Sequence, residues 1–339
     1  MAEALAVAQV GGWAGILGTC ADVDGRWQMA DGGWPHRPAR APAICHLPSA
    51  ICIMATLPVE GRWSVRALSE DDVRHALEFL RRDPLINVYL ISRIMEERSL
   101  ATQIVLVRFN GAIVLVASLA TNMVLGGDPS ISQELTDTAI MLISDRIISR
   151  SLSVRAIISP RHLVEALFEQ LRPRLDPPTV VRLSQPVYAI KRRLDYPDLT
   201  ESRFSTMRDL DKLVPACAAM HKEEVGIDPM DRDPVGYRER IRELVEKKRS
   251  VIRVVDGRIA TKCEFSAITG DAAQLMGVWT DPRYRRRGLS RALLAEVCGH
   301  FFRRGKSVTL FVNDFNKPAI ALYESLGFQR IGENRALIW

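Results

Sequence analysis

The sequence predicts an α/β fold, in which helices cover a mixed β-sheet, arranged as two successive halves of similar order. From Trp63 onward, short apolar runs of strand length alternate with amphipathic segments of helix length. Each half also contains one tight hairpin, at Asn110-Gly111 and at Asp256-Gly257. These dipeptides adopt the positive φ angles that a two-residue hairpin turn requires.

The first half begins with a strand at 63–67, and the run Ser69-Glu70-Asp71-Asp72 then supplies an N-cap and an acidic first turn. This signature predicts a helix directly after it. The remaining elements follow from the apolar periodicity. In chain order we expect helices at 73–80 and 84–97, hairpin strands at 104–109 and 112–119, a helix at 134–149, a strand at 154–158, a helix at 161–171 and a strand at 180–194.

The second half repeats this order after a short linker at 195–202, which contains Pro197. In chain order we expect a strand at 203–207, a helix from 208 to 220, a charged helix at 237–248, hairpin strands at 251–255 and 259–268, a strand at 274–279, an apolar helix at 289–302 and a strand at 307–312. Both halves share the order strand, helix, helix, hairpin, which points to an internal duplication. We therefore expect two domains, at 54–195 and 203–339.

Residues 1–53 differ in kind from the rest of the chain. They are rich in tryptophan, glycine and proline, and no helical or strand period runs through them. We expect this segment to be disordered or to lie outside the native protein, with Met54 as the translation start. Its apolar run from Ala4 to Leu17 follows Glu3 instead of a basic residue, which is a poor secretory signal.

The composition is that of an ordinary globular protein. Of the 339 residues, 47% are hydrophobic and 25% are charged, which is enough for two packed cores. The formal charge is +6, but the basic residues are scattered and form no long run, so nucleic-acid binding is only a third choice of function. No apolar run is long enough to cross a membrane. The six cysteines form neither a Cys-x-x-Cys pair nor a zinc-ligand pattern, so we expect a cytoplasmic protein without a metal site.

The segment from Arg285 to Ser290 lies between the expected strand at 274–279 and the apolar helix at 289–302. A loop that runs into a helix N-terminus exposes several backbone N–H groups together, and the helix dipole adds positive potential. Gly288 allows the backbone to approach a ligand closely. The segment therefore predicts an anion site suited to a pyrophosphate, although these features alone do not identify the ligand that carries this group.

The segment from Leu310 to Phe328 narrows that choice. It reads Leu-x-Val-x-x-x-Asn-x-x-Ala-x-x-Leu-Tyr-x-x-x-Gly-Phe and starts 25 residues after Arg285. Together with the Arg-x-x-Gly-x-Ser run before it, this pattern resembles the GNAT superfamily of N-acetyltransferases. Ser290 departs from the family, which prefers Gly or Ala there. The first half has no such loop, so the resemblance implies two tandem GNAT-like domains, of which the first is degenerate.

The resemblance implies that acetyl-CoA is the co-substrate and that a primary amine of a small molecule or protein is the acceptor. It implies a role for Tyr323 as the general acid that protonates the thiolate. Glu264 is the first candidate for the general base, followed by Glu224, with Glu223 and His221 beside it. The residues implied in cofactor binding are Met276, Gly277, Val278, Trp279, Arg285, Arg286, Arg287, Gly288, Leu289, Ser290 and Asn316.

Each of these residues also has an ordinary structural interpretation. Tyr323 could pack against the sheet, and Glu264 could face solvent on an alternating strand. A protein that binds acyl-CoA as a sensor or scaffold, without transferring the acyl group, is the alternative function, because a fold does not fix an activity. The acceptor and the oligomeric state have no readable signature in the sequence.

Overall fold

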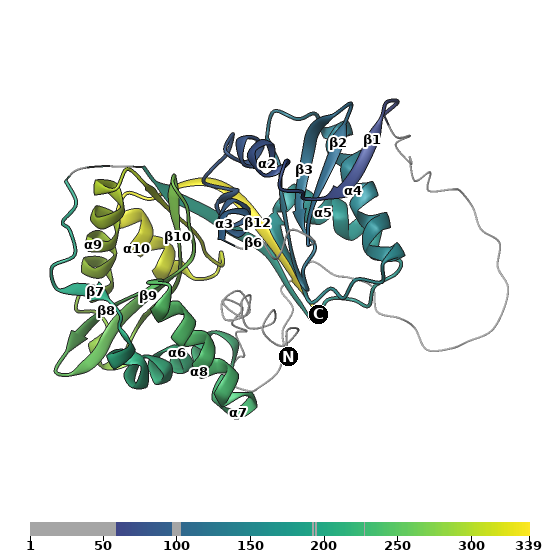
Figure 1. The fold of residues 1–339 in the computed structure, drawn as a ribbon. Helices are drawn as coiled ribbons and strands as arrows, with labels where there is room; N and C mark the ends of the chain where they lie inside the picture. The colour runs from purple at the N-terminus through teal and green to yellow at the C-terminus, as the bar shows by residue number, and fades with distance from the viewer. Residues whose placement is uncertain (1–58, 97–102, 192, 194, 227) are drawn as a thin grey trace, which may run out of the picture.

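The computed structural model describes residues 59–96, 103–191, 193, 195–226 and 228–339. The prediction for residues 1–53 falls outside these ranges. The described strands form one mixed sheet of 12 strands in the order β1-β2-β3-β4-β5-β12-β6-β11-β10-β9-β8-β7. Figure 1 shows the first half, in blue and teal, and the second half, in green, on either side of the long central strands. The predicted α/β architecture is confirmed.

In the first half both faces of the sheet are covered by helices. Ile104 and Leu106 of β2 pack into a cluster with α2 and α3, whereas Val105 and Val107 face α4 and α5. This follows from the two-residue period of a strand, which sends successive side chains to opposite faces. The elements are β1 (Trp63–Ala67), α2 (Val73–Leu80), α3 (Val88–Glu96), β2 (Ile104–Phe109), β3 (Ala112–Ser118), β4 (Asn122–Gly126), α4 (Gln133–Ser149), β5 (Ala156–Pro160) and α5 (Arg161–Leu171).

The second half is layered in the same way. One core cluster joins its sheet to α6 and α8, and another joins the opposite face to α9 and α10. The elements are β7 (Ser202–Phe204), α6 (Leu210–Val225), α7 (Pro229–Arg232), α8 (Pro234–Glu246), β8 (Ser250–Val255), β9 (Arg258–Ile268), β10 (Ala272–Thr280), α9 (Leu289–Arg303), β11 (Ser307–Phe311) and α10 (Lys317–Ser325). Short 3₁₀ turns at Met207–Asp209 and Pro282–Tyr284 precede α6 and α9.

The two halves exchange their last strands. β6 (Val180–Ile190) ends the first half in chain order but pairs with β11 of the second half. β12 (Gln329–Ile338) ends the chain but pairs with β5 of the first half. β6 and β12 also pair with each other, and Figure 1 shows them side by side between the halves. Each half therefore completes the sheet of the other.

Most predicted elements are confirmed, and both hairpin turns have the expected positive φ angles, 48° at Asn110 and 49° at Asp256. The differences lie in short or late elements. The sequence interpretation missed β4, α7, α10 and β12, extended β6 to residue 194 where the strand ends at Ile190, and placed at 203–207 the strand that spans Ser202–Phe204. The runs of three to five residues in β4, α7 and β7 carry too few periods to be recognised. β12 is longer, but Ile331 is the one large apolar residue among its first seven, so it shows no strand period.

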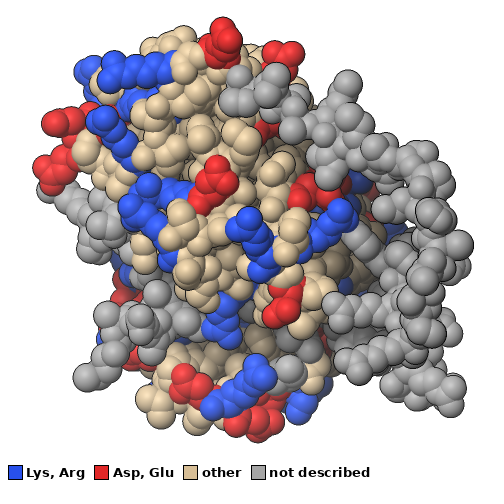
Figure 2. Space-filling model, turned by 90° about the vertical axis from the view of Figure 1, so that its right-hand side faces the viewer, with Lys and Arg blue, Asp and Glu red and all other residues tan. Residues whose placement is uncertain are grey.

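The surface and the cysteines fit a packed globular protein. Cys217, Cys263 and Cys298 are buried free thiols. Within the described ranges, no helix has both the length and the apolar character needed to cross a membrane. On the face in Figure 2, basic and acidic side chains are interspersed and form no single basic patch, which gives no support to nucleic-acid binding.

The strand exchange makes a prediction about folding. Fragments 1–195 and 196–339 should each fail to fold alone, because β5 and β11 would expose unpaired inner edges and apolar side chains. Expressed together, they should assemble into a one-to-one complex with the circular dichroism spectrum of the intact chain. Size-exclusion chromatography of each fragment and of the pair measures this. A stably folded monomer of 196–339 alone would contradict it.

Candidate active site

A gap in strand pairing opens between β10 and β11. The two strands are parallel neighbours over only three pairs, which end at Gln274 and Thr309. β10 nevertheless continues to Thr280 and β11 to Phe311. Beyond Gln274 the two strands therefore no longer pair with each other. The backbone of β10 from Leu275 onward has no strand partner in β11, and we call this stretch the β10–β11 cleft.

A β-bulge lies in β10 at this cleft. Met276 pairs with Glu264 of β9 and Trp279 pairs with Lys262, so two residues of β10, Gly277 and Val278, oppose Cys263 alone. A bulge removes its extra residue from the regular ladder. Because β11 has already diverged, the peptide groups of Gly277 and Val278 have register partners on neither side. These residues belong to the segment 276–279, which the GNAT resemblance implies in binding of the cofactor.

Gly277 is required by both its conformation and its surroundings. Its φ angle is +56°, in the left-handed region that favours glycine. A Cβ atom placed there would lie 2.8 Å from Oε2 of Glu264. The bulge and the Glu264 side chain therefore form one packed unit.

The predicted phosphate loop forms an anion-binding geometry at the start of α9. Arg286 and Gly288 have φ angles of +60° and +74°, and Gly288 is the N-cap residue. Backbone turns of this kind collect N–H groups into an anion-binding concavity. No side chain caps the helix, so the first N–H groups of α9, from Leu289 onward, are available to a ligand.

Three side chains of this loop contact neighbouring residues. Arg285 donates to the carbonyl oxygen of Thr280 at 3.0 Å and to Glu223 at 2.5 Å, and the guanidinium of Arg287 lies 5.4 Å from the ring centre of Tyr284. The Ser290 hydroxyl forms a short hydrogen bond with that of Thr280. The extra oxygen at Ser290 is therefore engaged by the end of β10.

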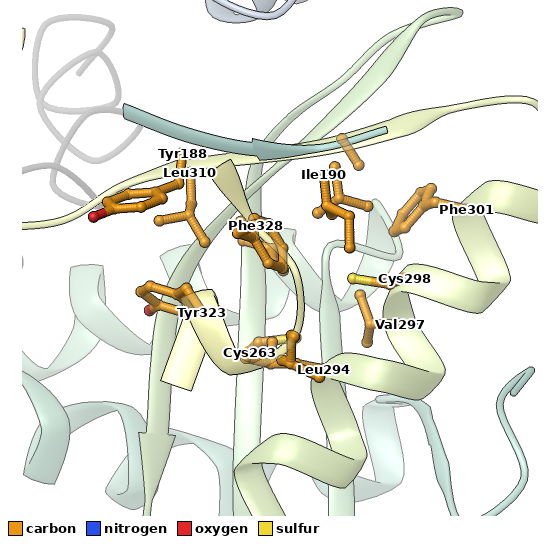
Figure 3. Close-up of a cluster of buried hydrophobic side chains, with 14 of the residues drawn as sticks. Tyr188, Ile190, Cys263, Leu294, Val297, Cys298, Phe301, Leu310, Tyr323 and Phe328 are labelled. Carbon is orange, nitrogen blue, oxygen red and sulfur yellow. The ribbon is translucent and has the colours of Figure 1, made fainter. Parts of the chain in front are cut away.

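α10 contributes the remaining two predicted residues. Asn316 is its N-cap and accepts from the N–H of Ala319 at 3.3 Å. Tyr323 is the buried residue of this helix, with 7% of its surface exposed. Figure 3 shows it in the core cluster with Cys263, Leu310 and Phe328. Burial raises the pKa of Tyr323, and the nearby Glu224 carboxylate acts in the same direction, so the phenol stays protonated.

Glu264 is held in a buried ion pair. One of its carboxylate oxygens, Oε1, accepts from Nζ of Lys262 at 2.7 Å and from Sγ of Cys217 at 3.0 Å. The exposed fractions of Lys262 and Glu264 are 0% and 3%. Burial by itself would raise the pKa of Glu264, but the Lys262 ammonium outweighs it and the pKa is lowered.

Glu224 differs from Glu264 in having a carboxylate oxygen without a partner and a raised pKa. Its Oε2 atom is buried and has no hydrogen-bond partner among the described residues. Burial raises the pKa of Glu224 to about 8; the Lys262 charge opposes this rise and the charges of Glu264 and Glu223 support it. Because Glu224 also influences the pKa of Tyr323, the two side chains share one electrostatic environment.

The remaining two candidates for the general base, Glu223 and His221, make contacts with neighbouring side chains. Glu223 accepts from Nε1 of Trp279 at 3.2 Å and from Arg285 at 2.5 Å, which ties α6 to the phosphate loop. His221 is half-buried, and its ring centre lies 6.3 Å from that of Tyr237. Burial lowers the pKa of His221, and the Arg240 charge adds to this effect.

Lys262 is the site residue that sequence reasoning missed. A signal was available: Lys262 and Glu264 are two residues apart on an apolar strand, so they share one face and can pair there. Among the described residues no group of three or more His, Cys, Asp or Glu side chains has the geometry of a metal site.

In the first half, the loop before α4 forms hydrogen bonds with its own side chains. Asp128 accepts from Arg82 at 2.7 Å and from the N–H of Ser130 at 2.9 Å. Ser132 caps α4 by accepting from the N–H of Leu135. In this loop a carboxylate and a serine hydroxyl therefore accept from backbone N–H groups, including one at the start of α4. The degeneracy of this half as a GNAT-like domain remains a prediction.

The diverging strands β10 and β11, the bulge in β10 and the uncapped start of α9 all lie within one stretch of the chain that matches a known protein family. Residues 217–328 match the family model described as the acetyltransferase (GNAT) family. The second half therefore contains a GNAT domain. A GCN5-related N-acetyltransferase from Sphaerobacter thermophilus has a similar fold, with a TM-score of 0.53 at 18% identity over 81% of this chain and 94% of that one.

Relatives known by sequence match over a shorter stretch. The chain is 48% identical over 59 residues to the ribosomal protein bS18-alanine N-acetyltransferase of Escherichia coli, which is 17% of this chain and 40% of that protein. It is 47% identical over 58 residues to the N-alpha-acetyltransferase RimI of Mycobacterium tuberculosis, or 17% of this chain and 35% of the relative. The matches thus span well under half the length of these relatives.

The packing around Gly277 generates a prediction about stability. Gly277→Ala should lower the free energy of unfolding by about 1–2 kcal/mol for the left-handed backbone and by about 1–3 kcal/mol more for the contact with Glu264. Gly257→Ala is the matched control, because Gly257 has φ +71° and no neighbour within 4 Å of a Cβ atom. Urea denaturation followed by circular dichroism compares the two, and equal losses would contradict the packing argument.

Proposed function

We propose that this protein is an acetyl-CoA-dependent N-acetyltransferase that acetylates a primary amine. The observation that carries the proposal is the combination, in one half of the chain, of a β10 backbone left unpaired by β11, an uncapped start of α9, and the half-buried Glu224 that influences the pKa of buried Tyr323. A thioester on a long phosphorylated arm matches an unpaired strand backbone together with an anion site. The GNAT domain at 217–328 supports the same activity.

In this proposal the cofactor lies along β10 and ends at α9. The N–H groups of 286–290 hold the pyrophosphate, and the bulge at 276–279 binds the pantetheine arm through its backbone. Asn316 uses its carbonyl oxygen as the α10 cap, so its amide NH₂ remains for the cofactor. The neighbouring arginines screen the phosphate charge.

Glu224 is the group best suited to act as general base. A pKa of about 8 makes the Glu224 carboxylate a stronger base than an ordinary glutamate, and it is unprotonated above about pH 8. Its unpartnered Oε2 can accept a proton directly or through water. Glu264, ranked first from the sequence, is less basic because Lys262 and Cys217 already bind its Oε1 atom.

The chemistry then proceeds by direct transfer. The neutral amine nitrogen forms a bond to the thioester carbonyl carbon and loses one proton to Glu224, so that the amide product keeps one N–H. The carbon–sulfur bond breaks, the Tyr323 phenol donates its proton to the departing thiolate, and the proton taken by Glu224 then restores the phenol. A phenol whose pKa burial has raised remains protonated until that moment.

The acceptor belongs to one of two classes, small-molecule amines or protein N-termini. The E. coli relative is named for an alanine of a ribosomal protein, so a short peptide with a free N-terminal alanine is the first probe, beside a panel of small primary amines. Release of CoA thiol by the full chain on addition of a probe tests the proposal. Binding of acetyl-CoA without thiol release across the whole panel would favour the sensor or scaffold instead.

Replacement of Glu224 tests the base. kcat/KM should rise with pH through about 8 as Glu224 loses its proton, and Glu224→Gln should lower it by about 10²–10⁴-fold and remove this inflection. The pH dependence of thiol release in the wild type and in Glu224→Gln measures this. An unchanged inflection in the variant would assign the titration to the acceptor amine.

Stability gives a second readout of the same group. The folded protein keeps a proton on Glu224 that the unfolded chain releases near pH 4.5, so the free energy of unfolding falls as pH rises from about 5 to about 8. Glu224→Gln should reduce this fall while it abolishes activity. Urea denaturation at pH 5 and pH 9 measures it, and an equal fall in both proteins would contradict the raised pKa.

Replacement of Tyr323 tests the acid. Tyr323→Phe should lower kcat by about 10²-fold or more and change KM for acetyl-CoA little, because only the proton donor is lost. Tyr188→Phe is the matched control: it lies in the same core cluster, but its hydroxyl donates to Glu324 at 2.9 Å. Equal effects of the two variants would show that Tyr323 only packs.

A further inference from the structure

We propose that Lys262 is a positioning residue, whose buried ammonium fixes the β10 bulge in the shape that receives the acyl donor. This inference rests on the proposed function. Nζ of Lys262 donates to the carbonyl oxygen of Gly277 at 3.1 Å as well as to Oε1 of Glu264 at 2.7 Å. It also contacts Sδ of Met220 on α6 at 3.3 Å. One side chain thus joins β9, the bulge and the helix that carries Glu224.

Burial of the Lys262 ammonium costs free energy of desolvation, which argues against an incidental contact. Lys262 has an exposed fraction of 0%, and an ammonium in such a place must be compensated by close partners. Two of its partners, the Gly277 carbonyl and the Glu264 carboxylate, belong to the strands that border the cleft. A pair of apolar side chains would fill the same volume without this cost.

The geometry explains what the ammonium does for the bulge. Gly277 is left-handed, and its peptide is outside the register of β9. Its carbonyl oxygen would otherwise need another donor, since buried backbone acceptors are satisfied in nearly all native structures. By binding this oxygen, Lys262 fixes the orientation of the peptide plane between Gly277 and Val278. The N–H of that plane, on Val278, points the opposite way from the carbonyl.

A second constraint keeps Lys262 in place. Oε2 of Glu264 would lie 2.8 Å from a Cβ atom at Gly277, so the carboxylate packs against the bulge while its Oε1 binds the ammonium. Glu264 therefore acts through Lys262, as a second positioning residue, which accounts for a buried carboxylate whose pKa is lowered. Small displacements of reacting groups lower rates steeply, so the loss of this clamp should affect turnover.

The test compares Lys262→Met with a double variant and a matched control in the full chain. Lys262→Met should lower kcat by about 10- to 100-fold, with a smaller change in KM for acetyl-CoA. Calorimetry with ADP, which probes the phosphate loop alone, should give an unchanged Kd. Arg253→Met is the control, because Arg253 is a buried cation that pairs with Glu201 and lies on β8, a strand that β9 separates from β10. It should keep the wild-type kcat even where it loses stability.

Lys262→Met/Glu264→Met separates positioning from charge compensation. If Lys262 only neutralises Glu264, removal of both charges restores the wild-type kcat, and this result overturns the proposal. If Lys262 holds the bulge, the double variant regains thermal stability but keeps the low kcat. Wild-type kcat in the single variant would also overturn it. Absence of thiol release by the wild-type protein is a separate result, which would contradict the acetyltransferase function itself.

Discussion

The pairing of β6 with β11 is the contact on which the geometry of the site depends. Leu310 and Phe311, the last residues of β11, pair with Tyr188 and Val187 of β6. Their backbone groups are thereby satisfied on one side, which lets the other side stay apart from β10. An inner strand edge without such support tends to close by pairing or to recruit another chain. The edge of β11 that faces away from β10 is therefore covered by a strand that the first half supplies.

The pKa values of two carboxylates of the second half, the buried Glu264 and the half-buried Glu224, are shifted in opposite directions. Lys262 binds Glu264 directly and lowers the pKa of this carboxyl group. At Glu224 the Lys262 charge acts without a hydrogen bond, so burial outweighs it and the pKa rises to about 8. Environments that separate the pKa values of neighbouring groups are a mark of assigned acid–base roles. A single ammonium thus forms an ion pair with one carboxylate and leaves the other with a raised pKa.

Local features of the fold and site could be predicted from the sequence, and non-local ones could not. Asn110-Gly111 and the loop before Leu289 depend on the conformations of a few adjacent residues, which the sequence displays. The apolar run of β6 indicates a strand but carries no information on which distant edge it joins. The order of the two base candidates depended on such a contact as well: Glu264 could be placed on a strand, but the ammonium of Lys262 against the Gly277 carbonyl follows from the bulge in a second strand.

The first half is bound to the site by more than β6. Val88 of α3 packs with Ala267 and Ala272 at the end of the β9–β10 hairpin, and Arg249, next to β8, pairs with Glu96 of α3. These contacts hold the two strands that carry Lys262 and the bulge. In the first half, by contrast, Asp128 and Ser132 accept from backbone N–H groups of their own loop and of α4. What this half contributes to the second is support, because α3 packs on the β9–β10 hairpin and β6 pairs with β11.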